Sequence, residues 1–186
     1  MIQLLFVLRR ELFDQLSARG ALLDQITPAL LQDISNELLE MGVKIVVIKL
    51  GSKGLYLRTA AEAAIKNLGR ACPLDWKSWR DRELWAPCFK VDVVGTTGSG
   101  DTTIAGFLSA LLRHNAPEEV ITMAVAVGAC NVETVDALSG LRSWEDTLAR
   151  VKAGWERLDI NLALPGWKWD KNKQVWVGPL DGLPTA

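Results

Sequence analysis

The chain has 186 residues, a formal net charge of −1 and 49% hydrophobic residues. This length suits one ordinary domain with a substantial core. The near-neutral charge gives no electrostatic reason to bind nucleic acid or an anionic membrane, so neither partner is expected. No apolar run reaches membrane-spanning length. The arginines at positions 9 and 10 follow the first apolar stretch, whereas a signal peptide places its basic residues first.

The cysteines indicate a reducing compartment. They are odd in number and lack the spacing of metal ligands: Cys72, Cys88 and Cys130. Together with the missing leader pattern, they make a cytoplasmic protein the expectation.

The first half of the chain alternates helical and strand patterns. Residues 2–19 carry leucines at helical spacing and end at Gly20. A second helix is predicted over 28–41, with Thr27 as its N-cap. Residues 43–50 form a nearly continuous apolar run, which is typical of a strand in a covered parallel sheet. The alternation predicts an α/β fold.

A glycine-rich turn, residues 95–101 (GTTGSGD), stands between an apolar run at 91–94, which is predicted to be the end of a buried strand, and a helix. The helix carries an apolar face at Ile104, Phe107, Leu108, Leu111 and Leu112. Backbone N–H groups at such a helix start attract anions. Asp101 follows directly and is the best general-base candidate. Glycine-rich turns are common, however, and an Asp in a first helical turn is usually a dipole partner, so spacing alone leaves both readings open.

A second turn, GSKG at 51–54, follows the predicted strand 43–50. By itself it reads as a simple hairpin turn into a strand at 55–58. Further on, a buried helix is predicted over 118–134, and Ser143 with Asp146 form a capping box for a last helix. The tail predicts a two-stranded hairpin with paired tryptophans.

The sequence GTTGSGD followed by TTIAGF resembles the D-T-x-G-A-G-D signature of the ribokinase-like (PfkB) carbohydrate kinases. The resemblance implies that Asp101 is the base that deprotonates the accepting hydroxyl. It also implies an anion hole formed by Gly98, Ser99 and Gly100. Two positions depart from the signature: Gly95 replaces its first Asp, which puts a role of that carboxylate in doubt, and Ser99 replaces its Ala.

The strand and GSKG turn are similar to a second motif of the same family, which lines the nucleotide. The implied nucleotide-binding residues are Lys49, Gly51, Ser52 and Gly54, together with Asn131 near the adenine. The implied cofactors are Mg²⁺ carried with ATP and a monovalent cation such as K⁺ near the 136–140 loop.

The family fold implied is a three-layer αβα domain with a mostly parallel sheet and a small β lid. Its members are longer, so residues 1–158 are expected to be the C-terminal, nucleotide-binding and catalytic half, with the N-terminal half and lid absent. The family's N-x-x-E motif is missing, since Asn36 is followed at the third position by Leu39. A naturally shorter protein completed by a partner, or a start codon assigned too late, are the alternatives. Residues 159–186 are predicted to be a tail with the tryptophan hairpin.

The resulting hypothesis is an ATP-dependent kinase that phosphorylates a sugar hydroxyl. A nucleoside or vitamin-precursor kinase of the same superfamily fits equally well, because the acceptor pocket is not in the chain. The hypothesis from another class is a truncated, non-catalytic nucleotide-binding or assembly module. In either case an α/β sheet divided in the middle exposes an edge strand, so the chain is expected to oligomerise through that edge.

Overall fold

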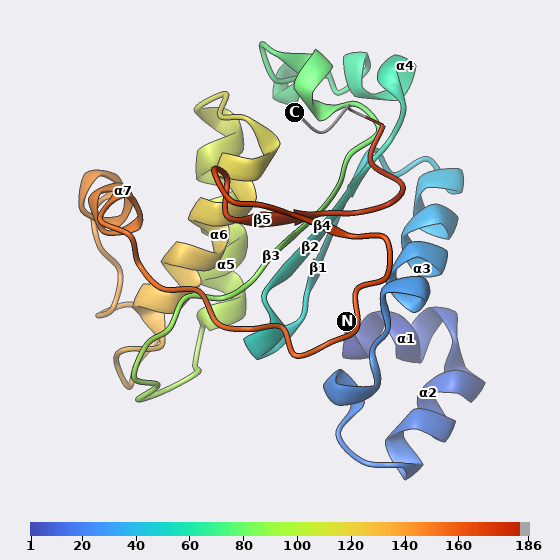
Figure 1. Cartoon of the computed structure of the whole chain (residues 1–186), viewed down its shortest axis with the longest axis horizontal. Helices are drawn as coiled ribbons and strands as arrows, with labels where there is room; N and C mark the ends of the chain where they lie inside the picture. Colours follow the sequence, from blue (N-terminus) through green and yellow to red (C-terminus); the bar gives the residue numbers. More distant parts are fainter. Residues whose placement is uncertain (183–186) are drawn as a thin grey trace.

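The computed structural model describes residues 1–182 and has three layers, with a sheet between two groups of helices (Figure 1). This confirms the predicted α/β class and αβα layering. The described residues form one five-stranded sheet in the order β1-β2-β3-β5-β4. Its strands are β1 (Ile45–Lys49), β2 (Leu55–Thr59), β3 (Glu83–Ala86), β4 (Lys168–Asp170) and β5 (Val175–Val177).

The prediction of a mostly parallel sheet is wrong for this part of the chain. All four strand pairings are antiparallel. The reason is the connections: five residues, 50–54, join β1 to β2, and parallel strands need a crossover of a dozen or more residues. The apolar character of β1 comes instead from the helices that pack on both faces of the sheet.

One helical layer contains α1 (Ile2–Leu8), α2 (Arg10–Ala18) and α3 (Pro28–Glu40). The other contains α5 (Ser99–Leu112), α6 (Pro117–Asn131) and α7 (Trp144–Lys152). The short helix α4 (Glu62–Lys66) lies at one end of the molecule (Figure 1). Four single turns of 3-10 helix complete the described structure: Leu22–Gln25, Gly51–Lys53, Gly69–Ala71 and Trp76–Trp79.

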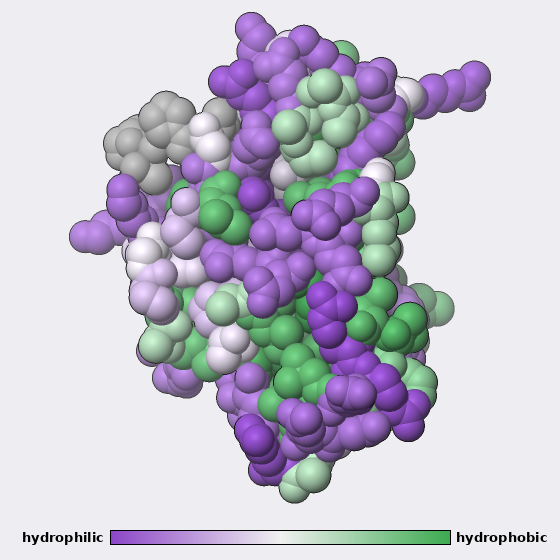
Figure 2. Space-filling model, turned by 90° about the vertical axis from the view of Figure 1, so that its right-hand side faces the viewer, coloured by the Kyte–Doolittle hydropathy of each residue, from purple (hydrophilic) through white to green (hydrophobic). Residues whose placement is uncertain are grey.

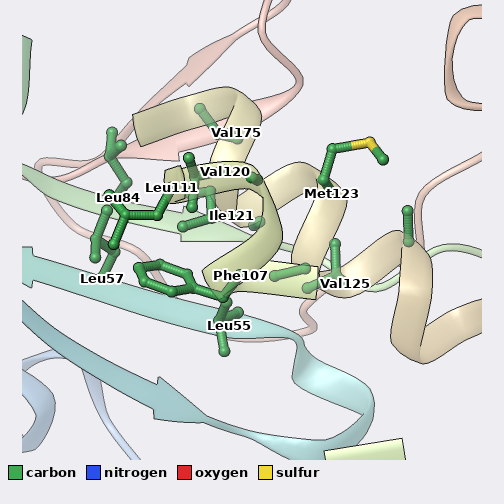
Figure 3. Close-up of a cluster of buried hydrophobic side chains, with 14 of the residues drawn as sticks. Leu55, Leu57, Leu84, Phe107, Leu111, Val120, Ile121, Met123, Val125 and Val175 are labelled. Carbon is green, nitrogen blue, oxygen red and sulfur yellow. The ribbon is translucent and has the colours of Figure 1, made fainter. Parts of the chain in front are cut away.

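Each face of the sheet has its own hydrophobic core. In the core on the α5–α6 side, leucines of β2 and β3 pack against aromatic and aliphatic residues of both helices (Figure 3). The opposite core joins α1, α2 and α3 to Tyr56, Trp85 and Trp167, whose rings pack edge to face or tilted. Buried aromatic rings of this size contribute much of the area removed from water.

Three local predictions are wrong. The helix predicted over 2–19 is broken at Arg9, whose backbone leaves the helical region (φ −141°, ψ 58°); Leu5 of α1 and Leu16 of α2 both lie in the core. The run 91–94 forms no strand, because the Val94 N–H donates to the Val132 carbonyl of a loop. Leu108 and Leu112 are 50% and 66% exposed, so the buried face of α5 excludes them.

Other local predictions are confirmed. The Thr27 side chain accepts a hydrogen bond from the Leu30 N–H at the start of α3, and Ser143 caps α7 in the same way. The tryptophan hairpin forms, with Trp169 opposite Trp176. Because β5 also pairs with β3, the hairpin completes the sheet. The predicted tail, 159–186, extends into residues 183–186, which lie outside the described residues.

None of the helices in the described chain is long and apolar enough to cross a membrane. All three cysteines are unpaired. The face formed on the α1–α3 side is hydrophilic in its upper part and carries hydrophobic side chains in its lower half (Figure 2). The exposed hydrophobic residues of α1 are Ile2, Phe6 and Val7.

A buried ion-pair network joins β3 to α6 and to the end of the described chain. The Arg82 side chain, 5% exposed, pairs with Glu118 at 2.6 Å and with Asp181 at 2.9 Å. Its guanidinium also donates to the Ser78 carbonyl. Removing one partner of a buried pair leaves an uncompensated charge, so this network is sensitive to Arg82 in particular.

We expect Arg82→Met to lower the free energy of unfolding by about 3–5 kcal/mol, because two carboxylates lose their buried cation. Urea denaturation followed by circular dichroism measures this change. The matched control is Arg80→Met, whose pair with Glu62 is largely exposed and should contribute under about 1 kcal/mol. Equal losses in the two variants would contradict the importance of burial.

Candidate nucleotide and phosphate site

A cleft of about 320 Å³ opens between the β1–β2 turn and the start of α5. It brings together residues that are distant in the sequence. The turn contributes Lys49, Gly51, Ser52 and Gly54, and the helix contributes Ser99 and Gly100. These belong to both of the glycine-rich motifs singled out from the sequence, and what they bind stays a prediction.

The glycine turn has the geometry of a helix start that can hold an anion. Gly98 is the N-cap of α5 and has a left-handed backbone (φ 75°), which favours glycine. Its carbonyl accepts hydrogen bonds from the N–H groups of Asp101 and Thr102. Within the described residues, the N–H groups of Gly98 and Gly100 have no backbone acceptor, so they remain able to bind an anion.

The Lys49 side chain reaches this turn from the end of β1. Its ammonium lies so close to Gly100 that a β-carbon at that position would stand 2.8 Å from Nζ. No ion pair joins Lys49 to a carboxylate anywhere in the part of the chain that the structure describes. A free cation beside free N–H groups is the charge pattern of a phosphate site.

The rest of the cleft is mostly apolar. Sequence reasoning missed several of the lining residues, which come from loops and from the C-terminal half of α6: Phe89, Val91, Val93, Val125, Val132 and Leu158. The small residues Gly128 and Ala129 of α6 also line the cleft. A narrow apolar wall suits a flat ring.

One thiol lines the cleft, and the Arg157 cation lies behind the wall residue Phe89 without lining the cleft itself. Cys88 donates to the Gly51 carbonyl at 3.3 Å, and burial raises the pKa of its thiol to about 11. The Arg157 guanidinium donates to the Pro87 carbonyl at 2.7 Å. Burial lowers the pKa of Arg157 to about 10, which leaves it charged at neutral pH. No described lining residue carries a carboxylate, so the cleft is electropositive.

Arg157 also begins a four-layer stack. Its guanidinium lies 3.9 Å from the centre of the Phe89 ring. Phe89 stacks on Trp155 with ring centres 4.4 Å apart. Arg150 covers the other side of Trp155 at 3.6 Å and is held by Glu133 through two hydrogen bonds of 2.6 Å. Each cation attracts the ring face beside it, and the two rings stack on each other, so the stack fixes Phe89 at the cleft wall.

Three predicted site residues lie outside the cleft lining: Gly98, Asp101 and Asn131. Asp101 is exposed in the first turn of α5, directly after Gly100. Asn131 is fully buried, and its amide donates to the Ala137 carbonyl at 2.8 Å, which holds the loop after α6. Its neighbour Val132 lines the cleft instead. The roles of Asp101 as base and Asn131 near the nucleotide remain predictions.

The residues present do not form a protein cage for a metal ion. Among residues 1–182 no three His, Cys, Asp or Glu side chains gather closely enough to hold one. Mg²⁺ is commonly held by substrate phosphates with one or two carboxylates and waters. The site therefore fits a magnesium ion that arrives with a nucleotide, with Asp101 as the nearest carboxylate in sequence to the anion-binding turn.

Comparison with known proteins was made at the level of family, sequence and structure. The profile of the pfkB family carbohydrate kinases matches residues 2–144. A protein of Archaeoglobus fulgidus named an uncharacterized sugar kinase is 32% identical over 103 residues, which cover 55% of this chain and 33% of that protein.

Solved structures of sugar kinases are similar to this chain as well. The ribokinase of Thermotoga maritima is 31% identical, with a TM-score of 0.50 over 64% of this chain and 34% of its own. A Clostridium perfringens structure gives a TM-score of 0.55 at 18% identity over 72% of this chain and 37% of its own, which shows the fold alone. The chain spans about a third of the length of these relatives. Because the family profile covers most of its residues, the chain belongs to the pfkB family of carbohydrate kinases.

Proposed function

We propose that this chain is the nucleotide-binding and catalytic part of a kinase that transfers the γ-phosphoryl group of ATP to a sugar hydroxyl. The observation that carries the proposal is the meeting of the Lys49 ammonium with Ser99 and Gly100, at the start of α5, in one electropositive cleft. The adenine ring would occupy the apolar wall near Phe89 and Val132, and the phosphates would lie at the N–H groups of the turn.

The transfer step follows from these positions. Asp101 takes the proton of the sugar hydroxyl, and the hydroxyl oxygen forms a bond to the γ-phosphorus. The bond from that phosphorus to the β–γ bridging oxygen breaks, and ADP leaves. Lys49 and the N–H groups of Gly98 and Gly100 stabilise the negative charge on the transferred oxygens. Magnesium carried by the nucleotide would neutralise part of the phosphate charge.

A monovalent cation, K⁺ for example, is part of the proposal at the loop after α6. The Asn131 side-chain oxygen Oδ1 is buried and has no hydrogen-bond partner among the described residues. A β-carbon at Gly95 would stand 2.8 Å from the backbone carbonyl oxygens of Thr134 and Val135, so these two carbonyls lie close to Gly95. Carbonyl oxygens of this kind are donors that can replace the hydration shell of K⁺.

The alternative function is a non-catalytic nucleotide-binding or assembly module. The observation that favours it is the free edge of β1. On the β2 side of the strand, the Lys44 carbonyl accepts a hydrogen bond from the Ala60 N–H, and the Leu50 N–H donates to the Gly54 carbonyl. By the antiparallel alternation, the N–H and carbonyl of Val47 point outward. The amino group of Met1 already reaches the outward Lys49 carbonyl at 3.4 Å. An unpaired edge of this kind adds strands from another copy or partner.

The first prediction concerns nucleotide affinity. We expect Lys49→Gln to weaken binding of a magnesium-bound, non-hydrolysable ATP analogue about tenfold, because the phosphates lose their cation. Isothermal titration calorimetry on the whole chain measures the dissociation constant. Lys44→Gln, at the other end of the same strand, is the control and should change it little. Absence of binding by the unaltered chain would refute both the kinase proposal and the binding module.

The second prediction concerns the base. In the phosphoryl-transfer reaction with a panel of sugars, Asp101→Asn should lower kcat by roughly a hundred- to ten-thousandfold. Nucleotide affinity should stay unchanged, because the Asp101 side chain does not line the cleft. The control is Glu145→Gln, an acidic residue in the first turn of α7. A loss of less than about tenfold would exclude Asp101 as the base.

The third prediction tests the edge of β1. We expect the chain to associate in size-exclusion chromatography at micromolar concentration. Val47→Pro should reduce that association, because it removes an outward N–H without breaking the ladder to β2. Val47→Ala keeps the N–H and serves as the control. A compact monomer at all concentrations, or equal association of the two variants, would argue against pairing through β1.

A further inference from the structure

A second hollow, of about 730 Å³, lies on the far half of α6 from the nucleotide cleft. We call it the α6–α7 groove. Its floor is Thr122 and Met123 of α6, one wall is α7, and the other wall is the β4–β5 turn at 172–174. It shares no lining residue with the cleft. The pfkB-family site described above does not use it.

The α7 wall is apolar and flat. Trp144, Leu148 and Val151 recur at the spacing that places them on one face of the helix, and all three are partly buried against the core. The Arg113 guanidinium lies 4.7 Å from the centre of the Trp144 ring, so a cation is held at one end of this wall. Such a wall accommodates an aromatic or other flat apolar body.

The charge of the groove is positive. Three cationic side chains line it without a carboxylate partner among the described residues: Arg113, Lys152 and Lys173. Glu118 is committed to its buried pair with Arg82. Glu119 is the other acidic lining residue, and it accepts a hydrogen bond from the Asn115 amide at 3.1 Å. Three free cations against one exposed carboxylate attract an anion.

The β4–β5 wall is preorganised. The Asp170 carboxylate accepts hydrogen bonds from the N–H groups of Asn172 and Lys173 at 2.9 and 3.0 Å, which fixes the turn. Gln174 has a left-handed backbone (φ 52°) and returns the chain to β5. The turn therefore holds Lys173 at the groove without needing a ligand to order it, and a preorganised wall lowers the cost of binding.

We propose that the α6–α7 groove is a binding site for a small organic anion, a phosphate or sulfonate ester with a flat apolar body. The body lies against Trp144 and Leu148, and the anionic group lies among Arg113, Lys152 and Lys173. The size of the groove falls within the range of small-molecule sites. Because α6 lines the groove with one half and the cleft with the other, the two sites are separate positions on one buried helix.

The test uses 1-naphthyl phosphate as the probe and the whole, isotopically labelled chain. Its NMR signals are followed during titration. We expect shifts at the Trp144 indole N–H and the Gln174 amide, and weaker shifts with uncharged 1-naphthol. Lys173→Gln should weaken naphthyl phosphate binding about fivefold, through the loss of one exposed charge interaction.

The matched control is Lys171→Gln. Lys171 is exposed in the same turn and does not line the groove, so this variant should bind like the unaltered chain. Shifts confined to cleft residues such as Gly100, or no shift at Trp144, would overturn the proposal. Equal weakening by the two lysine variants would also overturn it, because the attraction would then be non-specific. None of these three outcomes decides whether the cleft binds a nucleotide.

Discussion

The fold depends on one helix that is buried on nearly every side. Twelve residues of α6, between Pro117 and Asn131, are buried. A helix of this kind must be apolar all round, and it can only exist between other elements. Gly106 of α5 lies so close to it that a β-carbon there would stand 3.0 Å from the side chain of Val127. This close packing sets the position of α5, and with it the position of the glycine turn relative to β1.

The same constraint explains why some predictions from sequence succeed. Motifs whose geometry is local could be located directly: Thr27 and Ser143 cap their helices, and Gly98 adopts the backbone that its glycine permits. The layering followed from alternating apolar periodicities, because each helix and strand must bury its own apolar side. The continuous apolar pattern of α6 indicated its burial before any neighbour was known.

The remaining features depend on partners that periodicity does not reveal. The strand direction of β1 was misjudged because burial on both faces makes an antiparallel strand as apolar as a parallel one. The run 91–94 has strong β propensity, yet the Val94 N–H is satisfied by a loop carbonyl, and no strand lies beside it. The apolar wall of the cleft joins Phe89 and Leu158, which are far apart in sequence. Tertiary packing, which no short motif encodes, brings them together.

The stack that begins at Arg157 has a consequence for how the cleft attracts its ligand. Exposed charges act on a distant anion only across the screening length of the solution, about 8 Å at physiological ionic strength. Lys49, at the open cleft, is subject to that screening. Arg157 is enclosed by Phe89 and the Pro87 carbonyl, with no described carboxylate as its partner. Its field reaches the cleft through protein, where dissolved ions do not enter. The contribution of Arg157 to the positive potential at this site is therefore screened less by salt.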